Sequence, residues 1–516
     1  DLHRVDRRQR QMCIRDSSLT AAMALGMLSG CGNTASNTGT ASPAETGTAT
    51  TESTDTASSG DKTSISIYRA SFNQATVASD EVKKVQDAIN DYIADKINVE
   101  ITITDIASGE YGDKANLALS NNEVNLLWTA SWNGSLATDN LYAQNAVYDI
   151  TDLVKDTTLY KAMPEAVWEA SSYDNKTYFI PIYKESAEGC DLVVPQRLID
   201  AHNWDISKIK ELKDIEPMLA DCKADGLKYP LLTQGMDFFY LYYIDKYDFF
   251  SKNSLWAVER ATDTVVNVVQ TSDYADFVKM MCKWGALGYI NDEEVTKSTP
   301  ANAIMTQDWG FAAWADVPDN SDATSTYAQE CAVIPITQTW SHSNSTLGSC
   351  YAITSNSTEE QAKACIDFLG LLYTDTTLAD LFTYGIEGTD YDLVDGRISP
   401  KGDLYSHSPW ESTSVKAPSL TVNEPENKVQ LYEDFNKKSN SSCASGFRFN
   451  QSPVEAQIAA CNNVYNEYGY VLEQGGYSES DVDQALVDYQ NALDEAGYQD
   501  ILSEIQSQYE AWKATK

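Results

Sequence analysis

The chain carries little of what most catalytic and metal sites are built from. Its four histidines, His3, His202, His342 and His407, are far apart in the sequence, and none of its ten cysteines stands in a C-x-x-C pair. A zinc ribbon, a thioredoxin-type site and a metal cluster are therefore not expected. The G-x-S-x-G, H-E-x-x-H, P-loop and dinucleotide-binding patterns are also missing. We expect a protein that binds without catalysis and that needs neither a cofactor nor a metal.

Positive charge is scarce as well. The sequence has 37 Lys and Arg against 76 Asp and Glu, which gives a formal net charge of -39. Such a surface repels nucleic acid and anionic lipid, so neither is expected as a partner. An acidic, well-solvated surface that keeps an exported protein soluble is the simpler interpretation of this excess.

Long apolar runs are limited to one short stretch, Leu19 to Leu28, followed by Leu28-Ser29-Gly30-Cys31. The run is too short to span a bilayer but suits the h-region of a signal peptide. Small residues before a cysteine form a bacterial lipobox, so Cys31 is predicted to become the first residue of a lipid-anchored mature protein. Acidic residues interrupt the basic region upstream, and we expect about the first 16 residues not to be native.

A low-complexity segment follows the lipobox. Residues 32–62 consist mostly of Thr, Ser, Ala, Gly and Asn and contain hardly any large apolar side chain. Such a segment cannot bury enough surface to offset its ordering entropy, so it is predicted to be a flexible linker. The remaining body is long enough for two or three lobes.

The body opens with a β-α-β pattern. Ile65 to Tyr68 alternates as a strand, Asp80 to Ile97 places Val82, Val85, Ile89 and Ile93 on one helix face, and Val99 to Ile103 is a second strand. This order predicts a parallel sheet with right-handed crossovers. Asn125 to Thr129 continues the sheet, and the loop Ser131 to Gly134 follows at the end where α/β sheets bind ligands.

Further elements follow from the same signals. Tyr178 to Tyr183 is an extended run in which Pro181 favours an edge position. Glu359 to Tyr373 is predicted to be a capped amphipathic helix. Cys365 and Cys461 are expected to be buried thiols, and Cys331 with Cys350 is a weak candidate for a disulfide. Other helices are predicted over 196–202, 206–225, 274–287, 482–496 and 498–512, and other strands over 311–314, 332–336 and 350–354.

Several of these segments together resemble a known family. The segments are Ala130-Ser131-Trp132, Tyr178 to Glu185, Phe311 to Trp314, the helix at Glu359 to Tyr373, Tyr384 to Tyr391, and Gly446 to Val454. With them the chain resembles the extracellular solute-binding lipoproteins of ABC transporters, close to the sugar-binding branch and to a Firmicutes subgroup with a C-terminal domain of unknown function. The segment Cys190 to Pro195 departs from the family pattern, which leaves the first strand of the second lobe in doubt.

The resemblance implies an α/β fold, a two-lobed periplasmic-binding-protein-like clamshell of type II with a helical C-terminal module. Two lobes would close on a ligand about a hinge. The expected divisions are 1–31 for the signal peptide, 32–62 for the linker, 63–182 and 327–375 for lobe 1, 183–326 and 376–440 for lobe 2, and 441–516 for the C-terminal module.

A sugar site needs aromatic planes for C–H faces and polar groups for hydroxyls. Residues that follow predicted strands or line the expected crossing supply both kinds. For each of them, packing in a core is the competing interpretation, and Glu387 serves equally well as a helix cap. The predicted ligand-binding residues are Trp132, Trp314, Tyr183, Glu185, Trp309, Asp316, Glu387, Tyr384, Arg69 and Asn73.

The sequence therefore predicts a monomeric, lipid-anchored solute-binding component of an ABC importer. It would lie on the extracellular face of the membrane of a Gram-positive-type bacterium and bind an oligosaccharide or related polyhydroxylated solute, a carbohydrate above all, by lobe closure. It would hand this solute unaltered to permease subunits. The alternatives are a sensor or an adhesin that presents bound solute, a peptide-binding protein, and a glycoside hydrolase that uses two of Glu185, Asp316 and Glu387.

Overall fold

The computed structural model describes residues 62–73, 77–233, 238–250, 255–300, 303–314, 318, 329–402 and 404–515, without the side chains of Trp314 and Ser343. The chain divides into two compact units, 1–59 and 60–516, and every described residue belongs to the second. The predicted lipobox, Cys31 and nearly all of the predicted linker lie outside the described residues. None of the helices in the described ranges is both long and apolar enough to cross a membrane.

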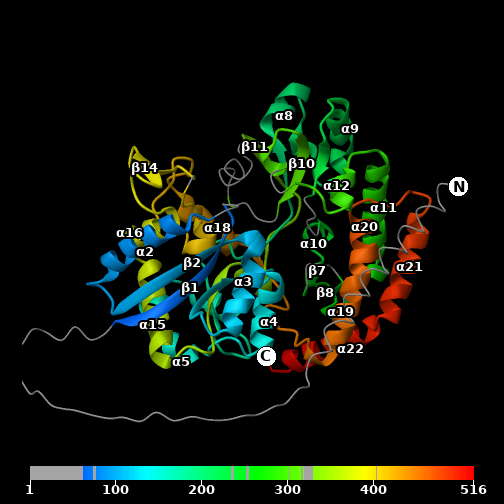
Figure 1. The fold of residues 1–516 in the computed structure, drawn as a ribbon. Coiled ribbons are helices and arrows are strands. Elements are labelled where there is room, and N and C mark those ends of the chain that lie inside the picture. The colour runs from blue at the N-terminus through cyan, green and yellow to red at the C-terminus, as the bar shows by residue number, and fades with distance from the viewer. Residues whose placement is uncertain are drawn as a thin grey trace, which may run out of the picture. The chain divides into compact units, whose positions relative to one another are not determined.

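The second unit contains two lobes, each with sheets of its own (Figure 1). The first sheet has the order β2-β1-β3-β13-β4, in which β1 is parallel to β2 and β3, and β13 is antiparallel to β3 and β4. Pro181 lies in the edge strand β4, as predicted. Proline has no backbone N–H to donate, and at the edge of a sheet this costs no hydrogen bond between strands. The strands are β1 (Thr63–Ser71), β2 (Val99–Ala107), β3 (Leu126–Thr129), β4 (Phe179–Pro181) and β13 (Cys350–Ile353).

Amphipathic helices cover this first sheet. In α2 the buried residues include Val82, Val85, Ile89 and Ile93, which confirms the predicted face. In α15 the Thr358 side chain caps Gln361 and completes a capping box, as the sequence indicated. The helices are α2 (Ser79–Ile93), α3 (Ser108–Ser120), α4 (Thr138–Ala143), α5 (Thr151–Val154), α6 (Thr158–Lys161), α7 (Glu165–Ala170), α15 (Glu359–Leu372), α16 (Thr376–Tyr384), α17 (Pro409–Ser412) and α18 (Lys428–Lys438), with a 3-10 turn η1 (Gly134–Leu136).

The second lobe has a four-stranded sheet, β11-β5-β10-β6, and a three-stranded sheet, β7-β8-β9. The segment that departs from the family pattern forms β5, an inner strand between β11 and β10. The strands are β5 (Asp191–Pro195), β6 (Tyr229–Leu232), β7 (Tyr247–Phe249), β8 (Trp256–Glu259), β9 (Thr264–Asn267), β10 (Trp309–Trp314) and β11 (Cys331–Pro335). The α-helices are α8 (Gln196–His202), α9 (Glu216–Ala224), α10 (Phe238–Tyr242), α11 (Ser272–Ala286) and α12 (Asp292–Val295).

The single helix predicted over 206–225 is wrong. The chain forms two 3-10 turns, η2 (Ile206–Lys208) and η3 (Leu212–Ile215), before α9 begins. Pro217 occupies the first turn of α9, where proline is tolerated because that N–H needs no intrahelical partner. The same residue would interrupt a longer helix. Two other 3-10 turns lie in this lobe, η4 (Val268–Gln270) and η5 (Ala303–Met305).

The C-terminal helices share one hydrophobic core with the second lobe. Phe277 and Val278 of α11 are buried in the same cluster as Tyr489 and Leu493 of α21. The Tyr274 hydroxyl also donates to Glu473 at 3.0 Å across this contact. The C-terminal elements are η6 (Ser452–Val454), α19 (Glu455–Val464), the π-helical turn η7 (Tyr465–Gly469), α20 (Tyr470–Glu473), α21 (Val482–Glu495) and α22 (Tyr498–Lys513).

Three chain segments pass between the lobes and are bonded to one another. Residues 340–341 (β12, Trp340–Ser341) pair in parallel with 440–441 (β16, Asn440–Ser441). Glu188, in the first crossing, exchanges two backbone hydrogen bonds with Trp340, at 2.9 and 2.7 Å. The lobes are thus joined by adjacent extended segments, the arrangement of a hinge.

The structure moves two of the predicted lobe boundaries. Residues 331–335 form β11 in the four-stranded sheet of the second lobe, whereas the sequence predicts 327–375 in lobe 1. Residues 376–438, assigned to lobe 2, bury Leu378, Phe382, Tyr405 and Tyr432 in the core of the first lobe. The hairpin β14 (Tyr391–Val394) and β15 (Arg397–Pro400) belongs to this stretch. An amphipathic pattern shows that a segment has a buried face but not which core receives it.

All eight cysteines that the structure describes are free thiols, so the weak candidate bridge between Cys331 and Cys350 is not formed. Cys365 and Cys461 are both completely buried, as predicted. Burial raises the pKa of the Cys461 thiol to about 11.

Candidate functional site

Four aromatic rings meet where the strands of the first sheet end. Phe72 follows β1, Trp128 lies in β3, Trp132 is in the loop after β3, and Trp410 is in α17. The Phe72 ring centroid lies 4.9 Å from that of Trp410 and 5.9 Å from that of Trp132. The Trp132 and Trp410 centroids are 6.5 Å apart. We call Phe72, Trp128, Trp132 and Trp410 the aromatic cluster.

Hydrogen bonds fix the two tryptophans of the β3 end. The indole of Trp128 is fully buried and donates to Ser349 Oγ at 3.0 Å. Trp132 remains 39% exposed, and its Nε1 donates to the carbonyl oxygen of Gly348 at 2.7 Å. Gly348 and Ser349 lead directly into β13, so the neighbouring strand holds both indoles. Trp132 thus presents a ring face to solvent from a fixed position.

Tilted rings with accessible faces suit a ligand that has apolar C–H surfaces. The planes of Trp132 and Trp410 are inclined at 44°, and Phe72 is inclined at 51° to Trp410. Phe72 and Trp410 are partly buried, with Trp128 beneath them as a buried support. Rings held in this way lose little conformational entropy when a ligand covers them.

The first crossing segment brings charged groups close to the aromatic cluster. The Lys184 ammonium pairs with the Glu185 carboxylate, and both side chains are only partly accessible. The Lys184 ammonium lies close to Gly348, the residue whose carbonyl oxygen accepts the hydrogen bond from Trp132: Nζ would be 3.8 Å from a Cβ atom added to this glycine. Tyr183 is 5% exposed, with the Lys416 ammonium 4.5 Å from its ring centroid.

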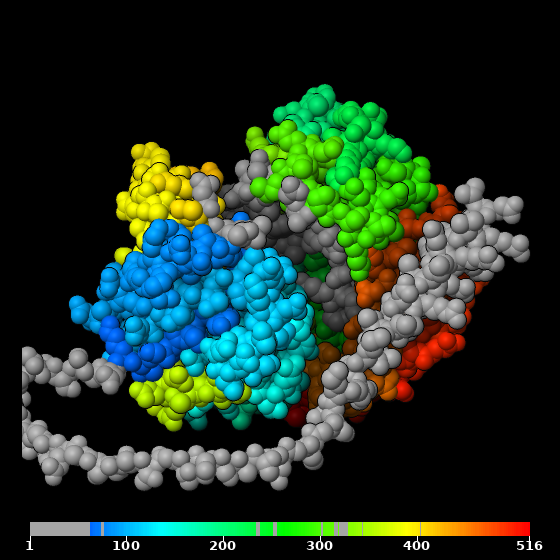
Figure 2. Space-filling view, viewed as in Figure 1, coloured from blue at the N-terminus to red at the C-terminus, as the bar shows by residue number. Residues whose placement is uncertain are grey.

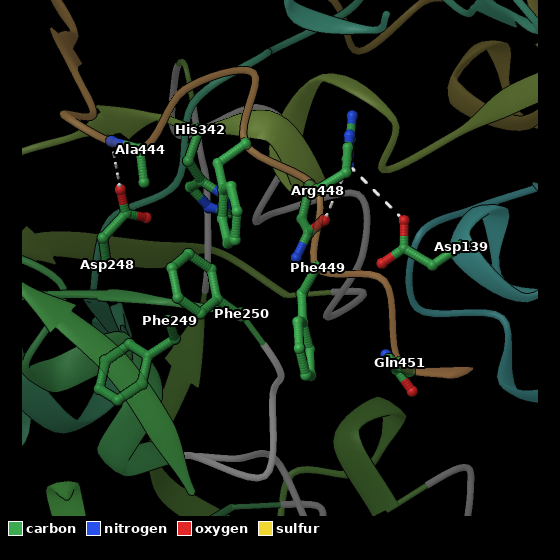
Figure 3. Close-up of a pocket in the computed structure, with 11 residues that line it drawn as sticks. Asp139, Asp248, Phe249, Phe250, His342, Ala444, Arg448, Phe449 and Gln451 are labelled. Atoms are coloured by element: carbon green, nitrogen blue, oxygen red, sulfur yellow. Dashed lines mark hydrogen bonds and ion pairs between the residues drawn. The ribbon is translucent and has the colours of Figure 1, made fainter. Parts of the chain in front are cut away.

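A pocket beside these residues is lined from both lobes and the crossing (Figure 3). Water-sized molecules can occupy only about 20 Å³ of it, and it is partly open to solvent. Figure 2 shows a hollow between the cyan surface of the first lobe and the green and orange surfaces of the second. Asp139 comes from α4, His342 and Asn344 from the crossing, and Asp248, Phe249, Phe250, Ala444, Phe447, Arg448, Phe449 and Gln451 from the second lobe and its C-terminal part.

Arg448 spans this pocket from a strap, residues 443–451, that precedes α19. Its guanidinium donates to Asn344 Oδ1 at 3.2 Å and to the carbonyl oxygen of Ala170 at 3.3 Å, and lies 4.4 Å from the Tyr173 ring centroid. The backbone carbonyl oxygen of Asn344 accepts from Ser131 Oγ at 2.8 Å. The pocket and the Trp132 loop are therefore linked through one residue.

Two predicted ligand residues, Arg69 and Asn73, form hydrogen bonds within the first lobe. Arg69 is fully buried, and its Nε and Nη2 donate to Asp105 at 2.6 and 2.9 Å. Burial opposes ionisation, but Arg69 and His407 outweigh it and hold the pKa of Asp105 well below its usual range. Asn73 is exposed next to Phe72, and its amide donates to Ser408 Oγ at 3.2 Å. Arg69 is enclosed where no ligand reaches it, whereas Asn73 lies at the edge of the aromatic cluster.

Three other predicted residues make their contacts elsewhere. Trp309 is fully buried in the second lobe, where its Nε1 donates to the carbonyl oxygen of Ile304 at 3.1 Å. Tyr384 is buried with Tyr391 in a small separate cluster, which raises the pKa of Tyr384 well above its ordinary value. Glu387 is exposed on the loop between them. The Trp314 side chain and Asp316 lie outside the described residues.

Trp410 is not among the residues predicted from the sequence to bind the ligand, because a four-residue helix carries no periodic signal.

Among the described residues, no group of three or more His, Cys, Asp or Glu is placed to hold a metal ion. The arrangement offers apolar ring faces beside hydrogen-bonding groups, which is the chemistry of a binding site for a polyhydroxylated molecule.

Comparisons with known proteins give consistent matches. Residues 87–388 match the family model of bacterial extracellular solute-binding proteins, and residues 443–514 match that of a domain of unknown function, DUF3502. A carbohydrate ABC transporter substrate-binding protein from Streptococcus pneumoniae serotype 4 is 24% identical over 481 residues, covering 89% of this chain and 93% of the relative.

Solved structures share the fold. The N-glycan transport solute-binding protein NgtS from Streptococcus pneumoniae superposes with a TM-score of 0.75 at 20% identity, covering 88% of this chain and 100% of NgtS. NgtS has also been crystallised with Man1GlcNAc and Man5GlcNAc. The substrate-binding protein FusA of Streptococcus pneumoniae, in complex with kestose, has a TM-score of 0.60 at 14% identity and covers 88% of this chain and 100% of FusA. These neighbours confirm the predicted two-lobed α/β fold.

Proposed function

Because the chain belongs to the family of bacterial extracellular solute-binding proteins, we propose that it binds an oligosaccharide between its two lobes for an ABC importer. The aromatic cluster is the observation that carries this proposal. Trp132 presents an exposed face, and Phe72 and Trp410 are partly accessible beside it. Sugar rings have apolar C–H faces that pack on such planes.

The polar surroundings favour a solute with many hydroxyls. Lys184 and Glu185 lie next to the cluster, and Asn344 is connected to the Trp132 loop. A charge pair and an amide give donors and acceptors in both directions, as hydroxyl groups require. Oligosaccharide complexes of NgtS and FusA, which share the fold, support a carbohydrate ligand here.

Solute capture would use movement of one lobe against the other. The three crossing segments around β12 and β16 provide the hinge, and the pocket has walls from both lobes. A solute that touches both walls favours the closed form by the difference in its affinity for the two states. Permease subunits would then recognise the closed, monomeric protein and take up the unaltered carbohydrate.

We place this protein on the extracellular face of a bacterial membrane, held by a lipid on Cys31. The support is the lipobox sequence Leu28-Ser29-Gly30-Cys31. Two or more acyl chains are needed for stable anchoring, and a lipoprotein cysteine carries them. Metabolic labelling with radioactive palmitate tests this: the full chain should be labelled and the Cys31→Ser variant should not. Equal labelling of both would contradict the anchor.

A thermal-shift screen of the full chain tests the ligand class. Man5GlcNAc and kestose represent carbohydrates, and a tripeptide and spermidine represent the other small solutes that binding proteins carry. A ligand at 100 times its dissociation constant adds about 2.7 kcal/mol of stability, which is readily measured. We expect stabilisation by a carbohydrate, recovered intact by mass spectrometry. Stabilisation by the peptide or the polyamine alone, or recovery of a cleaved glycan, would overturn the proposal.

A further inference from the structure

A buried cluster of four charged or titratable residues lies under the aromatic cluster. Arg69 pairs with Asp105, and His407 Nε2 lies 2.9 Å from Asp105 Oδ2. On the other side of the imidazole, Nδ1 lies 3.3 Å from Glu411 Oε1. All four side chains are at most 1% exposed. Burying four such groups is expensive unless their charges balance, so the charge of His407 matters.

The same residues fix the short helix that carries Trp410. Glu411 Oε1 accepts a hydrogen bond from the backbone N–H of Ser408 at 2.9 Å, which closes the first turn of α17. The carbonyl oxygen of Ser412, the last residue of α17, accepts from the Tyr351 hydroxyl at 2.7 Å. A helix of one turn has little stability of its own. The position of the Trp410 ring against Phe72 therefore depends on the contacts of this segment.

The geometry around His407 favours the doubly protonated imidazolium. Nε2 makes a hydrogen-bond contact with Asp105 Oδ2, whereas Nδ1 lies at ion-pair distance from Glu411 Oε1 without a hydrogen bond to any described residue. Two carboxylates this close to the ring favour its positively charged form. With that form the cluster holds two cations, Arg69 and His407, and two anions, Asp105 and Glu411. Neutral imidazole would lose the attraction to both carboxylates, in a site where the side chains are at most 1% exposed.

The other groups facing His407 are consistent with this charge. Burial and the like charge of Arg69 act to lower the pKa of His407, but Asp105 and Glu411 outweigh them and raise it above its ordinary value. The phenol of Tyr405 packs at 5.2 Å from the imidazole centroid and donates to the carbonyl oxygen of Phe382. Tyr351 approaches from β13, and burial raises its pKa, so it stays neutral.

We propose that His407 is a positioning residue for the solute site: its imidazolium holds α17 and the Trp410 ring in place, and loss of its proton loosens this side of the aromatic cluster. The part that concerns solute affinity rests on the proposed function. A group whose pKa is raised on folding stabilises the folded state below its unfolded pKa and loses that effect as pH rises through the folded value. The ordering of α17 should thus be complete below about pH 6.5 and decline at higher pH.

Fluorine NMR on the full chain labelled with 5-fluorotryptophan tests the positioning role without any ligand. The Trp410 resonance is identified by its disappearance in Trp410→Phe, and it is followed from about pH 5 to 9, the range of histidine titration. We expect it to shift in one step above about pH 6.5 in the native protein and to be independent of pH in His407→Gln. A resonance that is flat in the native protein, or that shifts identically in His407→Gln, would overturn the proposal.

His202→Gln is the matched control. His202 Nε2 also lies close to a carboxylate, 2.7 Å from Asp225 Oδ2, but on the second lobe and with 24% of its side chain exposed. The Trp410 titration should be unchanged in this variant. If His407→Gln does not fold, Glu411→Gln decides the question. Glu411→Gln keeps the oxygen that accepts the hydrogen bond from Ser408 but removes the carboxylate next to His407. The pH at which the Trp410 resonance shifts must then be lower than in the native protein. An unchanged pH would refute the positioning role of His407.

Affinity for Man5GlcNAc gives a second, separate measurement. We expect the native protein to bind roughly threefold to tenfold more weakly at pH 9 than at pH 6, and His407→Gln to bind weakly at both. A Trp410 step without any glycan binding keeps the positioning role and rejects the proposed ligand. Glycan binding with a Trp410 resonance that does not change with pH supports the proposed ligand and rejects the positioning role of His407.

Discussion

Replacing Trp132 by alanine is the most direct test of the aromatic cluster. A large aromatic side chain offers up to about 250 Å² of surface, so the 39% of Trp132 that is exposed leaves about 100 Å² for a ligand. At about 25 cal/mol per Å², complete coverage contributes about 2.5 kcal/mol. Trp132→Ala should therefore weaken solute binding by up to about 70-fold, and by about fivefold if the ligand covers less than half of that face.

Isothermal titration calorimetry with Man5GlcNAc measures this change, and Trp204→Ala is its control. Trp204 is also partly buried and donates from Nε1, to Asp221 at 3.0 Å, but it stacks on His202 in the second lobe. Trp132→Phe keeps a ring while removing the bond to Gly348 and should lose less affinity than Trp132→Ala. Native-like affinity in a folded Trp132→Ala protein, or an equal loss in Trp204→Ala, would refute the assignment of the site.

Two further predictions concern stability, each measured by urea unfolding. Burial raises the pKa of Asp191 to about 7, so the ionised form of this side chain opposes folding above that pH. Asp191→Asn should therefore stabilise the protein by about 2 kcal/mol at pH 8 and not at pH 4. Equal stabilisation at the two pH values would contradict burial of the charge as the cause. A Cβ on Gly285 would collide with the carbonyl oxygen of Gly475, so Gly285→Ala should cost about 2 kcal/mol or more. Gly112→Ala, in open space on α3, should instead be neutral or stabilising by about 0.5 kcal/mol; similar losses in both would count against the steric explanation.

Local signals in the sequence were enough for much of the fold. The alternation of β1, the apolar face of α2 and the edge position of Pro181 all depend on neighbours within a few residues. Trp132 could be named as a candidate because it follows a buried strand at the end where such sheets bind ligands. Its geometry confirms an exposed ring at that edge, while its role in binding remains a prediction.

Long-range pairing accounts for what the sequence did not reveal. Arg69 follows the pattern of a site residue, yet it is the register partner of Asp105 in the adjacent parallel strand, and the pair is buried. That pairing could have been proposed once β1 and β2 were aligned. Trp410 gave no comparable signal, since its contacts to Phe72 join positions more than 300 residues apart.

The C-terminal region shows why lobe boundaries were the least predictable feature. The apolar stripe of α21 correctly indicated a buried face, but the face completes the core of the second lobe around Phe277 instead of forming a module of its own. Removing residues 443–514 would expose that core, so the domain of unknown function is a structural part of this lobe. The strap before α19 then carries Arg448 to Ala170 and Tyr173 on the other lobe. Because one region both completes a lobe and touches its partner, a sequence pattern that reports only burial cannot assign it to either.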